Sequence, residues 1–133
     1  MQILAVDIGT GTQDVLLYDS ENEPENALQM ILPAPTQIIA SAIRAATAAG
    51  EDILLVGANM GGGPSNAATL QHMQAGRRVY ATLTAACTLD DDPQTVAEMG
   101  VRLVSEDEAA GLRGVRRLTL RDLDMDALRA AFA

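Results

Sequence analysis

Residues 2–19 read QILAVDIGTGTQDVLLYD and decide how the fold begins. The first part, Gln2–Ile8, is a short apolar run with β-branched residues, a pattern typical of a central strand buried on both faces. Glycine and threonine interrupt this run, and Asp14–Asp19 resumes a strand pattern. The stretch therefore predicts a β-hairpin, in which two antiparallel strands are joined by a tight turn.

The chain that follows adds a third strand and then a helix. A polar turn at Ser20–Asn26 contains a proline, and Ala27–Leu32 has the pattern of another strand. Thr36 is the expected N-cap of the next segment and Gly50 its expected left-handed C-cap, so a helix should lie between them.

Further along, strands and helices alternate. Strands are expected at residues 53–56, 79–83, 101–104 and around 118–120, and helices at residues 64–76, 93–99 and from Asp124 onward. In the second helix, Leu70 and Met73 are expected to face the core. This order favours an α/β fold with one mixed sheet, made of three antiparallel strands plus parallel strands, and with helices on both faces.

The chain shows no linker and no internal repeat, so residues 1–133 are expected to form one domain. Ala133 falls within or just after an apolar helix. We therefore expect residues 1–133 to be the N-terminal half of a longer, two-domain protein.

The composition excludes several chemistries. The 133 residues include nine arginines but no lysine, which rules out a P-loop of the GxxxxGK[ST] kind and a Schiff-base lysine. His72 and Cys87 are the only histidine and the only cysteine, so this chain is expected to hold neither zinc nor an iron–sulfur cluster. An unpaired cysteine also fits a reducing cytoplasm.

The charge and the apolar pattern narrow the partners. A formal charge of −9 repels polyanions, and three aromatic residues are too few for a base-stacking platform, so no nucleic acid is expected. The sequence has neither an apolar run of about 18 residues nor a basic signal peptide, so no membrane association is expected. We therefore expect a cytoplasmic domain.

The turn after the first strand is the most specific candidate site, and it consists of Asp7, Gly9, Thr10, Gly11, Thr12 and Gln13. Gly9 and Gly11 permit positive φ angles and the close approach of a ligand. Exposed amides and threonine hydroxyls can bind phosphate oxygens without a lysine. Asp7 is suited to hold Mg²⁺ through its water shell. The alternative is an ordinary hairpin turn with a solvated aspartate.

A second glycine-rich loop, Gly57–Gly63, follows the strand at residues 53–56 and leads through Pro64 into a helix. Ligands of open α/β sheets bind beyond the carboxyl ends of parallel strands, so this loop and the Asp7 turn should share one edge. Glycines at a helix N-terminus suit an anionic group, and the candidate residues are Gly61, Gly62, Gly63 and Ser65. The alternative is a flexible connection in which Ser65 merely caps the helix.

The remaining polar residues have simpler interpretations. Asp90–Asp92 could hold a metal, but a solvated loop whose last aspartate caps a helix is favoured. His72 is expected at the surface or its boundary, and Cys87 as a small buried hydrophobe. Arg77–Arg78 and Arg116–Arg117 are expected on solvated faces or at a link to a missing domain.

Two segments resemble known families. The stretch DIGTGTQ at Asp7–Gln13, followed by Val15–Asp19, resembles the first phosphate-binding motif of the actin-like ATPases, which include actin, heat-shock chaperones, sugar and acetate kinases and activators of acyl-CoA dehydratases. Their half-domain begins with the same element order and has the RNase H-like fold. More narrowly, AVDIGTGTQDVLLYD with the later GANMGGGPS resembles a poorly characterised family provisionally labelled as pyruvate formate-lyase activating proteins.

The resemblance implies ATP and Mg²⁺ as cofactors. Asp7 would be the carboxylate on the Mg²⁺ side, and Gly9–Thr12 would cradle the β- and γ-phosphates. Gln13 departs from many relatives, which have lysine, serine or asparagine there. The second phosphate motif and the adenosine motif belong to the other half of such proteins, so a C-terminal half-domain or a partner chain is implied. Glycyl-radical activation needs a three-cysteine cluster motif, and this chain has Cys87 alone.

The favoured interpretation is therefore the nucleotide-binding half-domain of an actin-like ATPase or phosphotransferase, with no general base identified. One alternative is a non-enzymatic assembly module of the same fold, which would self-associate as a homo-oligomer. Another is an RNase H-type nuclease that uses two metals. Such a nuclease needs a carboxylate near the end of the strand at 53–56, where Asn59 stands, and the acidic charge disfavours it.

Overall fold

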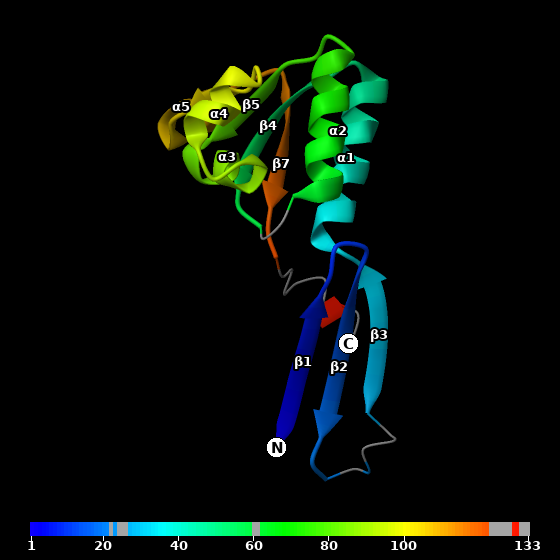
Figure 1. Ribbon diagram of the computed structural model, residues 1–133. Helices are drawn as coiled ribbons and strands as arrows, with labels where there is room; N and C mark the ends of the chain where they lie inside the picture. Colours follow the sequence, from blue (N-terminus) through cyan, green and yellow to red (C-terminus); the bar gives the residue numbers. More distant parts are fainter. Residues whose placement is uncertain (22, 24–26, 60–61, 123–128, 131–133) are drawn as a thin grey trace.

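The computed structural model describes residues 1–133 except 22, 24–26, 60–61, 123–128 and 131–133. The described strands form two separate sheets (Figure 1). One has three antiparallel strands in the order β1-β2-β3, and the other has four parallel strands in the order β6-β5-β4-β7. The mixed α/β class predicted from the sequence is confirmed at this level.

The three-stranded sheet consists of β1 (Gln2–Ile8), β2 (Thr12–Asp19) and β3 (Leu28–Pro33). The β1–β2 hairpin is confirmed, with a register that runs from Gln2 opposite Asp19 to Ile8 opposite Gln13. The expectation that β1 is a central strand buried on both faces is wrong. All seven of its residues are exposed or half-buried, because β1 is an edge strand of a sheet that extends away from the helices (Figure 1).

The four-stranded sheet consists of β4 (Asp52–Gly57), β5 (Val79–Thr82), β6 (Arg102–Val104) and β7 (Val115–Leu120). The helices are α1 (Pro35–Ala49), α2 (Gly63–Gln74), α3 (Leu83–Leu89), α4 (Pro93–Glu98) and α5 (Glu106–Gly111). Among the described residues, no helix has both the length and the apolar character needed to cross a membrane.

The expected single mixed sheet is wrong, because β1 does not pair with β4. The place beside β4 is taken by β7, in a parallel register from Asp52 opposite Val115 to Gly57 opposite Leu120. Gly57 has a φ of +75° and lies so close to the Leu120 carbonyl group that a Cβ atom would overlap it. Glycine is therefore the residue that this pairing of β4 with β7 allows at position 57.

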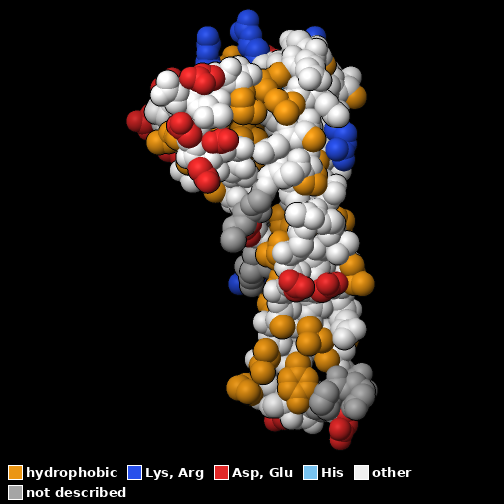
Figure 2. Space-filling view, viewed as in Figure 1, with side chains coloured by type: hydrophobic (Ala, Val, Ile, Leu, Met, Phe, Trp, Pro, Cys, Tyr) orange, Lys and Arg blue, Asp and Glu red, His pale blue; other side chains and the backbone are white. Residues whose placement is uncertain are grey.

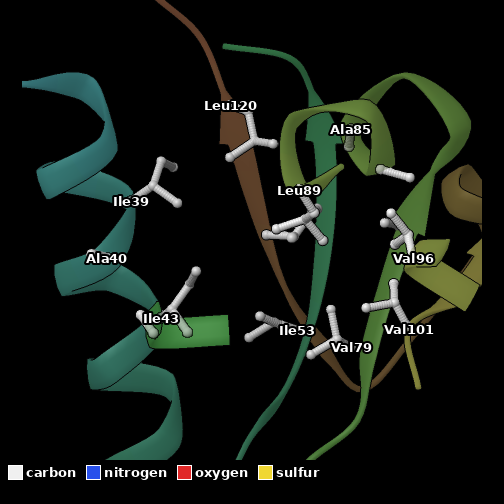
Figure 3. Packing of buried hydrophobic residues seen from close by; sticks show 14 of the residues in the cluster. Ile39, Ala40, Ile43, Ile53, Val79, Ala85, Leu89, Val96, Val101 and Leu120 are labelled. Carbon is white, nitrogen blue, oxygen red and sulfur yellow. The ribbon is translucent and has the colours of Figure 1, made fainter. Parts of the chain in front are cut away.

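The core lies on both faces of the four-stranded sheet. Alternate residues of a strand point to opposite faces. Ile53 and Leu55 of β4 pack in one cluster with residues of α1, α2, α3 and α4, and side chains of α1 point toward those of the strands (Figure 3). Leu54 and Val56 pack in a second cluster with Ala109 of α5. Helices therefore cover both faces of this sheet.

Helix α1 begins one residue earlier than its expected cap. Ala34 is the N-cap, with extended backbone angles and no side-chain cap, and Pro35 occupies the first turn, where its missing N–H group costs nothing. Thr36 is therefore inside the helix, and its expected capping role is wrong. Gly50 ends the helix in the left-handed conformation, as predicted, and its N–H group bonds the carbonyl groups of Ala46 and Thr47.

Two short helices were not predicted. Helix α3 follows β5 without a loop, because Thr82 ends the strand and also caps the helix by accepting from the Ala85 N–H group. Helix α5 begins with a capping box between Ser105 and Glu108. The predicted helix from Asp124 lies outside the described residues, as does much of the predicted turn at Ser20–Asn26.

Candidate functional site

The turn between β1 and β2 is exposed throughout Gly9–Thr12. The Gly9 N–H group donates to the Thr12 carbonyl group at 2.9 Å and closes the turn. Neither Gly9 nor Gly11 has a positive φ, so that expectation is wrong. Gly9 is instead constrained by space, since a Cβ would lie 3.1 Å from the Thr12 carbonyl oxygen, whereas open space surrounds Gly11.

Asp7 has an acidic neighbour that the sequence analysis missed. In the β1–β2 register Asp7 lies directly opposite Asp14, and both are exposed. They line a hollow of about 350 Å³ together with Leu16 and Ile31. Two opposed carboxylates repel each other across a strand pair, and a cation relieves that repulsion. The sequence did contain a signal for this pair. Asp7 lies three residues before Thr10 and Asp14 three residues after Gly11, so a hairpin turn centred on Thr10 and Gly11 places the two aspartates opposite each other.

Two carboxylates are few for a metal site. Among the residues that the structure describes, no group of three histidine, cysteine, aspartate or glutamate side chains could hold a metal ion. Mg²⁺ commonly takes only one or two carboxylates and keeps several waters, so two aspartates fit it better than they fit an ion that needs a protein cage.

Gln13 is turned away from solvent. Its side chain is buried, and its Nε2 atom donates to the Pro33 carbonyl group at 3.0 Å. The amide therefore ties the start of β2 to the end of β3. In this structure the Gln13 side chain positions the turn through this bond.

The start of α2 offers fewer donors than expected. Gly62 is the N-cap without a side-chain cap, and Gly61 lies outside the described residues. Pro64 has no N–H group, and that of Ser65 already donates to Oγ1 of Thr36 at 3.3 Å. Ser65 lies within the helix, so the alternative that it caps the helix is wrong. Gly63 has open space around it.

Gly62 has a packing role. A Cβ atom there would lie 2.7 Å from the carbonyl oxygen of Thr88 on α3 and 2.5 Å from Oδ1 of Asn66. Only glycine lets the start of α2 approach α3 so closely. This constraint is independent of any ligand.

The two glycine-containing segments meet at the N-terminal end of α1. The Ala34 N–H group donates to the Gly11 carbonyl group at 3.1 Å, which attaches the β1–β2 turn to the beginning of α1. Two residues later, Oγ1 of Thr36 lies 3.3 Å from Oγ of Ser65 on α2. The turn and the start of α2 are thus both held at the beginning of α1. The expectation that the turn and the second glycine loop share one sheet edge is wrong, because β1 and β4 belong to different sheets.

His72 and Cys87 are the reverse of what was expected. His72 on α2 is fully buried, and Cys87 on α3 is exposed. The reason for His72 is that α2 faces the core with Ser65, Ala68, Thr69 and His72, whereas Leu70 points to solvent and only Met73 is partly buried as expected. For Cys87, the neighbours Ala85 and Ala86 occupy the buried side of α3.

The aspartates before α4 form a capped loop. Asp90 accepts from the Asp92 N–H group at 2.9 Å, and Asp92 accepts from the Gln94 N–H group at 3.0 Å. The favoured interpretation, in which Asp92 caps the helix, is confirmed.

The fold and the site together define a mixed α/β protein in which a lysine-free glycine–threonine turn stands at the junction of two sheets. A family model described as "Putative pyruvate format-lyase activating enzyme" matches residues 60–133, more than half of the chain. The chain belongs to this family. No curated protein and no solved structure matches it.

The matched region begins inside the second glycine loop and includes all of α2 through β7. It does not include the hairpin with Asp7 and Gly9–Thr12. What can be said of that turn therefore rests on its geometry.

Proposed function

We propose that this chain is the nucleotide-binding half-domain of an actin-like ATPase or phosphotransferase, a class with the RNase H-like fold, although its two sheets do not form the single mixed sheet expected of that fold. The observation that carries the proposal is the exposed Gly9–Thr12 turn beside the opposed carboxylates of Asp7 and Asp14. The same turn is attached to the N-terminal end of α1. Helix N-termini favour negative charge, so phosphate groups suit this position.

The residues present fit Mg²⁺–ATP in part. Asp7, with Asp14 opposite, would hold Mg²⁺, and the exposed hydroxyls of Thr10 and Thr12 would donate to phosphate oxygens. Bound Mg²⁺ would neutralise phosphate charge at this site. The open space around Gly11 leaves room for a phosphate to approach the backbone.

The chain's own residues would act by positioning. Gln13 fixes β2 to β3, and the Gly11–Ala34 bond fixes the turn to α1, so the donors of the turn are held before any ligand arrives. Preorganised donors are the main contribution that proteins make to phosphoryl transfer. The Gly9–Thr12 turn is exposed to solvent. We propose that a second half-domain or a partner chain closes over it.

The description of the family concerns pyruvate formate-lyase activation. A three-cysteine cluster motif cannot be built from this chain, because Cys87 is its only cysteine. The proposal therefore assigns nucleotide binding to this chain and no radical step. A cytoplasmic location remains part of the same proposal.

One observation favours a second candidate function, an assembly module of the same fold. The three-stranded sheet exposes large apolar side chains on both faces, and Figure 2 shows hydrophobic side chains gathered over this end of the molecule. They are Ile3, Leu4, Ile8, Leu28 and Ile31. Contiguous exposed apolar surface commonly marks a protein interaction site.

Calorimetric titration with Mg²⁺–ATP tests the main proposal. Wild-type protein should bind, Asp7→Ala should bind at least about tenfold more weakly, and Asp91→Ala, a matched change in the exposed loop before α4, should bind as wild type does. Absence of heat with wild-type protein, in the presence and absence of Mg²⁺, contradicts nucleotide binding. Self-association without nucleotide binding, measured by light scattering, would favour the assembly module.

A further inference from the structure

A hollow lined by arginines lies where β5 and β6 begin, at the end of the four-stranded sheet that is away from the three-stranded sheet (Figure 1). Its volume is about 490 Å³, within the size range of small-molecule sites. Arg77, Arg78 and Arg102 line it, and none of its lining residues is acidic. Figure 2 shows arginine side chains gathered at this end of a chain whose formal charge is −9. Such a local field attracts anions even though the chain as a whole repels them.

Arg77 already has a structural role. Its Nη1 atom donates to the Gly50 carbonyl group at 3.0 Å, at the end of α1. This bond ties the segment after α2 to α1 and accounts for Arg77 without a ligand. Arg78 and Arg102 are the two arginines that remain to be explained.

Neither Arg78 nor Arg102 has a carboxylate partner. Both are exposed, and among the residues that the structure describes no ion pair joins either of them to an acidic side chain. The charge of Asp52 acts on Arg78, but its Oδ1 atom accepts from the Arg78 backbone N–H group, at 2.8 Å. Neither guanidinium is needed to cap α2, because backbone N–H groups already donate to the carbonyl groups of Gln71, His72 and Met73. Most donors of both guanidinium groups are therefore unused within the described part of the chain.

Tyr80 brings these two arginines together. Arg102 is its register partner on β6, and the Arg102 Cζ atom lies 5.9 Å from the centroid of the Tyr80 ring, within the range of a cation–π contact. Hydrogen bonding with the Tyr80 side chain is the main cause that raises the pKa of Arg78. Both guanidinium groups therefore lie beside one phenol ring, and that ring itself lines the hollow.

We propose that this hollow binds a small organic anion that carries phosphate or carboxylate groups, with Arg78 and Arg102 as the residues that hold its charge. The planar fork of donors on a guanidinium group matches both kinds of oxyanion, and charge-assisted hydrogen bonds of this type are the stronger ones. Met73 and Met99 add apolar lining for the organic part of the ligand. The residues of the hollow include none of the Gly9–Thr12 turn, so this site is independent of the proposed nucleotide site.

Tyr80 provides a local readout. The chain has no tryptophan and only two tyrosines, so in Tyr18→Phe protein the tyrosine emission comes from Tyr80 alone. The probes are glycerophosphate, a phosphate monoester, and citrate, a tricarboxylate. Glycerol is the uncharged control. The titrations are made without divalent cations and at a constant ionic strength set with sodium chloride.

At least one probe should change the Tyr80 emission along a saturable curve, with a dissociation constant below about 5 mM, and glycerol should not. A response to glycerophosphate alone assigns a phosphate ligand, and a response to citrate alone assigns a carboxylate ligand. A response to both assigns the oxyanion chemistry that they share. No response to either probe, or a linear change that never saturates, overturns the proposal.

Two variants test the arginines themselves. Arg78→Gln and Arg102→Gln should each weaken binding of the effective probe about fivefold or more, measured by calorimetry because loss of Arg102 alters the Tyr80 emission directly. Arg44→Gln removes the same charge from an exposed position on α1, and it should bind as wild type does. An equal loss in all three variants, or unchanged affinity in both Arg78→Gln and Arg102→Gln, overturns the proposal. Asp7→Ala should bind the probe as wild type does, so a failure of the nucleotide site is distinguishable from a failure of this one.

Discussion

Nδ1 of His72 on α2 lies 2.7 Å from Oγ1 of Thr47 on α1; His72 is fully buried and Thr47 is half-buried. The Thr47 hydroxyl donates to the Ile43 carbonyl group at 2.9 Å, so its oxygen accepts from the imidazole. Among the residues that the structure describes, Nε2 of His72 has no hydrogen-bond partner. The imidazole is therefore built into the contact between α1 and α2.

The first prediction concerns the pH dependence that follows. Burial lowers the pKa of His72, and it outweighs the opposing influence of the Arg78 backbone and the Asp52 carboxylate, while Arg77 adds to the lowering. The unfolded chain then begins to bind a proton as the pH falls through about 6.5, whereas the folded chain binds it only at a lower pH. Stability should be full above that pH and fall as the pH decreases.

Urea unfolding at several pH values between about 5.5 and 7.5, a window above the carboxylate pKa range, measures the effect. His72→Gln should be less stable at neutral pH and should lose most of the slope across this window. An unchanged slope in the variant would show that another group is responsible.

The sequence did not predict that His72 is buried, and the buried face of α2 shows why. That face consists of Ser65, Ala68, Thr69 and His72, which follow helical spacing but are small or polar. The sequence predicted that the apolar residues Leu70 and Met73 face the core, yet Leu70 points to solvent. Close packing of α1 on α2 selects small residues, and a pattern based on hydrophobicity cannot detect that.

The second prediction compares two isoleucines. Ile53 on β4 has no exposed surface, whereas Ile31 on β3 is 72% exposed. Ile53→Ala should lower the free energy of unfolding by about 2–5 kcal/mol, because it leaves a cavity between the sheet and α1. Ile31→Ala should change it by less than about 0.5 kcal/mol. Urea denaturation measures both, and equal losses would mean that the three-stranded sheet shares the core.

Turn and cap residues, which act locally, predicted most helices and strands. The pairing of strands that are far apart in the chain could not be predicted. The Gly–Thr interruption after Ile8 predicted the hairpin, and Gly50 predicted the end of α1. The apolar run of Gln2–Ile8 could not reveal that β7 occupies the place beside β4, because β7 lies far along the chain from both strands, 63 residues beyond its partner β4. For the same reason the candidate turn was found, but its attachment through Ala34 to α1 was not.

The third prediction tests the β4–β7 edge through two glycines with positive φ. Gly57→Ala places a methyl group on the Leu120 carbonyl group in addition to straining the backbone, and should cost at least about 3 kcal/mol. Gly76→Ala has a φ of +83° but open space, and should cost only about 1–2 kcal/mol. Thermal unfolding monitored by circular dichroism compares them. Equal costs would contradict the close approach of Gly57 to β7.

The fourth prediction concerns the ion pair between Arg116 on β7 and Glu51 before β4. Two contacts, at 2.7 and 3.2 Å, join the guanidinium to the carboxylate. Because the side chains are 35% and 42% exposed, solvent screens the pair, and its coupling energy should be about 0.5 kcal/mol. A double-mutant cycle with Arg116→Gln and Glu51→Gln measures it, and the coupling should decrease at high salt. A coupling above about 2 kcal/mol would contradict the exposed geometry.

The last prediction tests whether Asp7 and Asp14 bind a cation or only repel each other. Asp7 and Asp14 lie opposite each other on neighbouring strands, so without metal Asp14→Asn should raise the free energy of unfolding by about 0.2–1 kcal/mol. If the pair holds Mg²⁺, the ion should stabilise wild-type protein by mass action and leave Asp14→Asn nearly unaffected. The matched variant Asp91→Asn should respond to Mg²⁺ as wild type does. The measurement is the Tm with and without Mg²⁺, at a constant ionic strength set with sodium chloride. An equal Mg²⁺ shift in all three proteins would place the effect on general charge screening, and the two aspartates would then be only a repulsive pair.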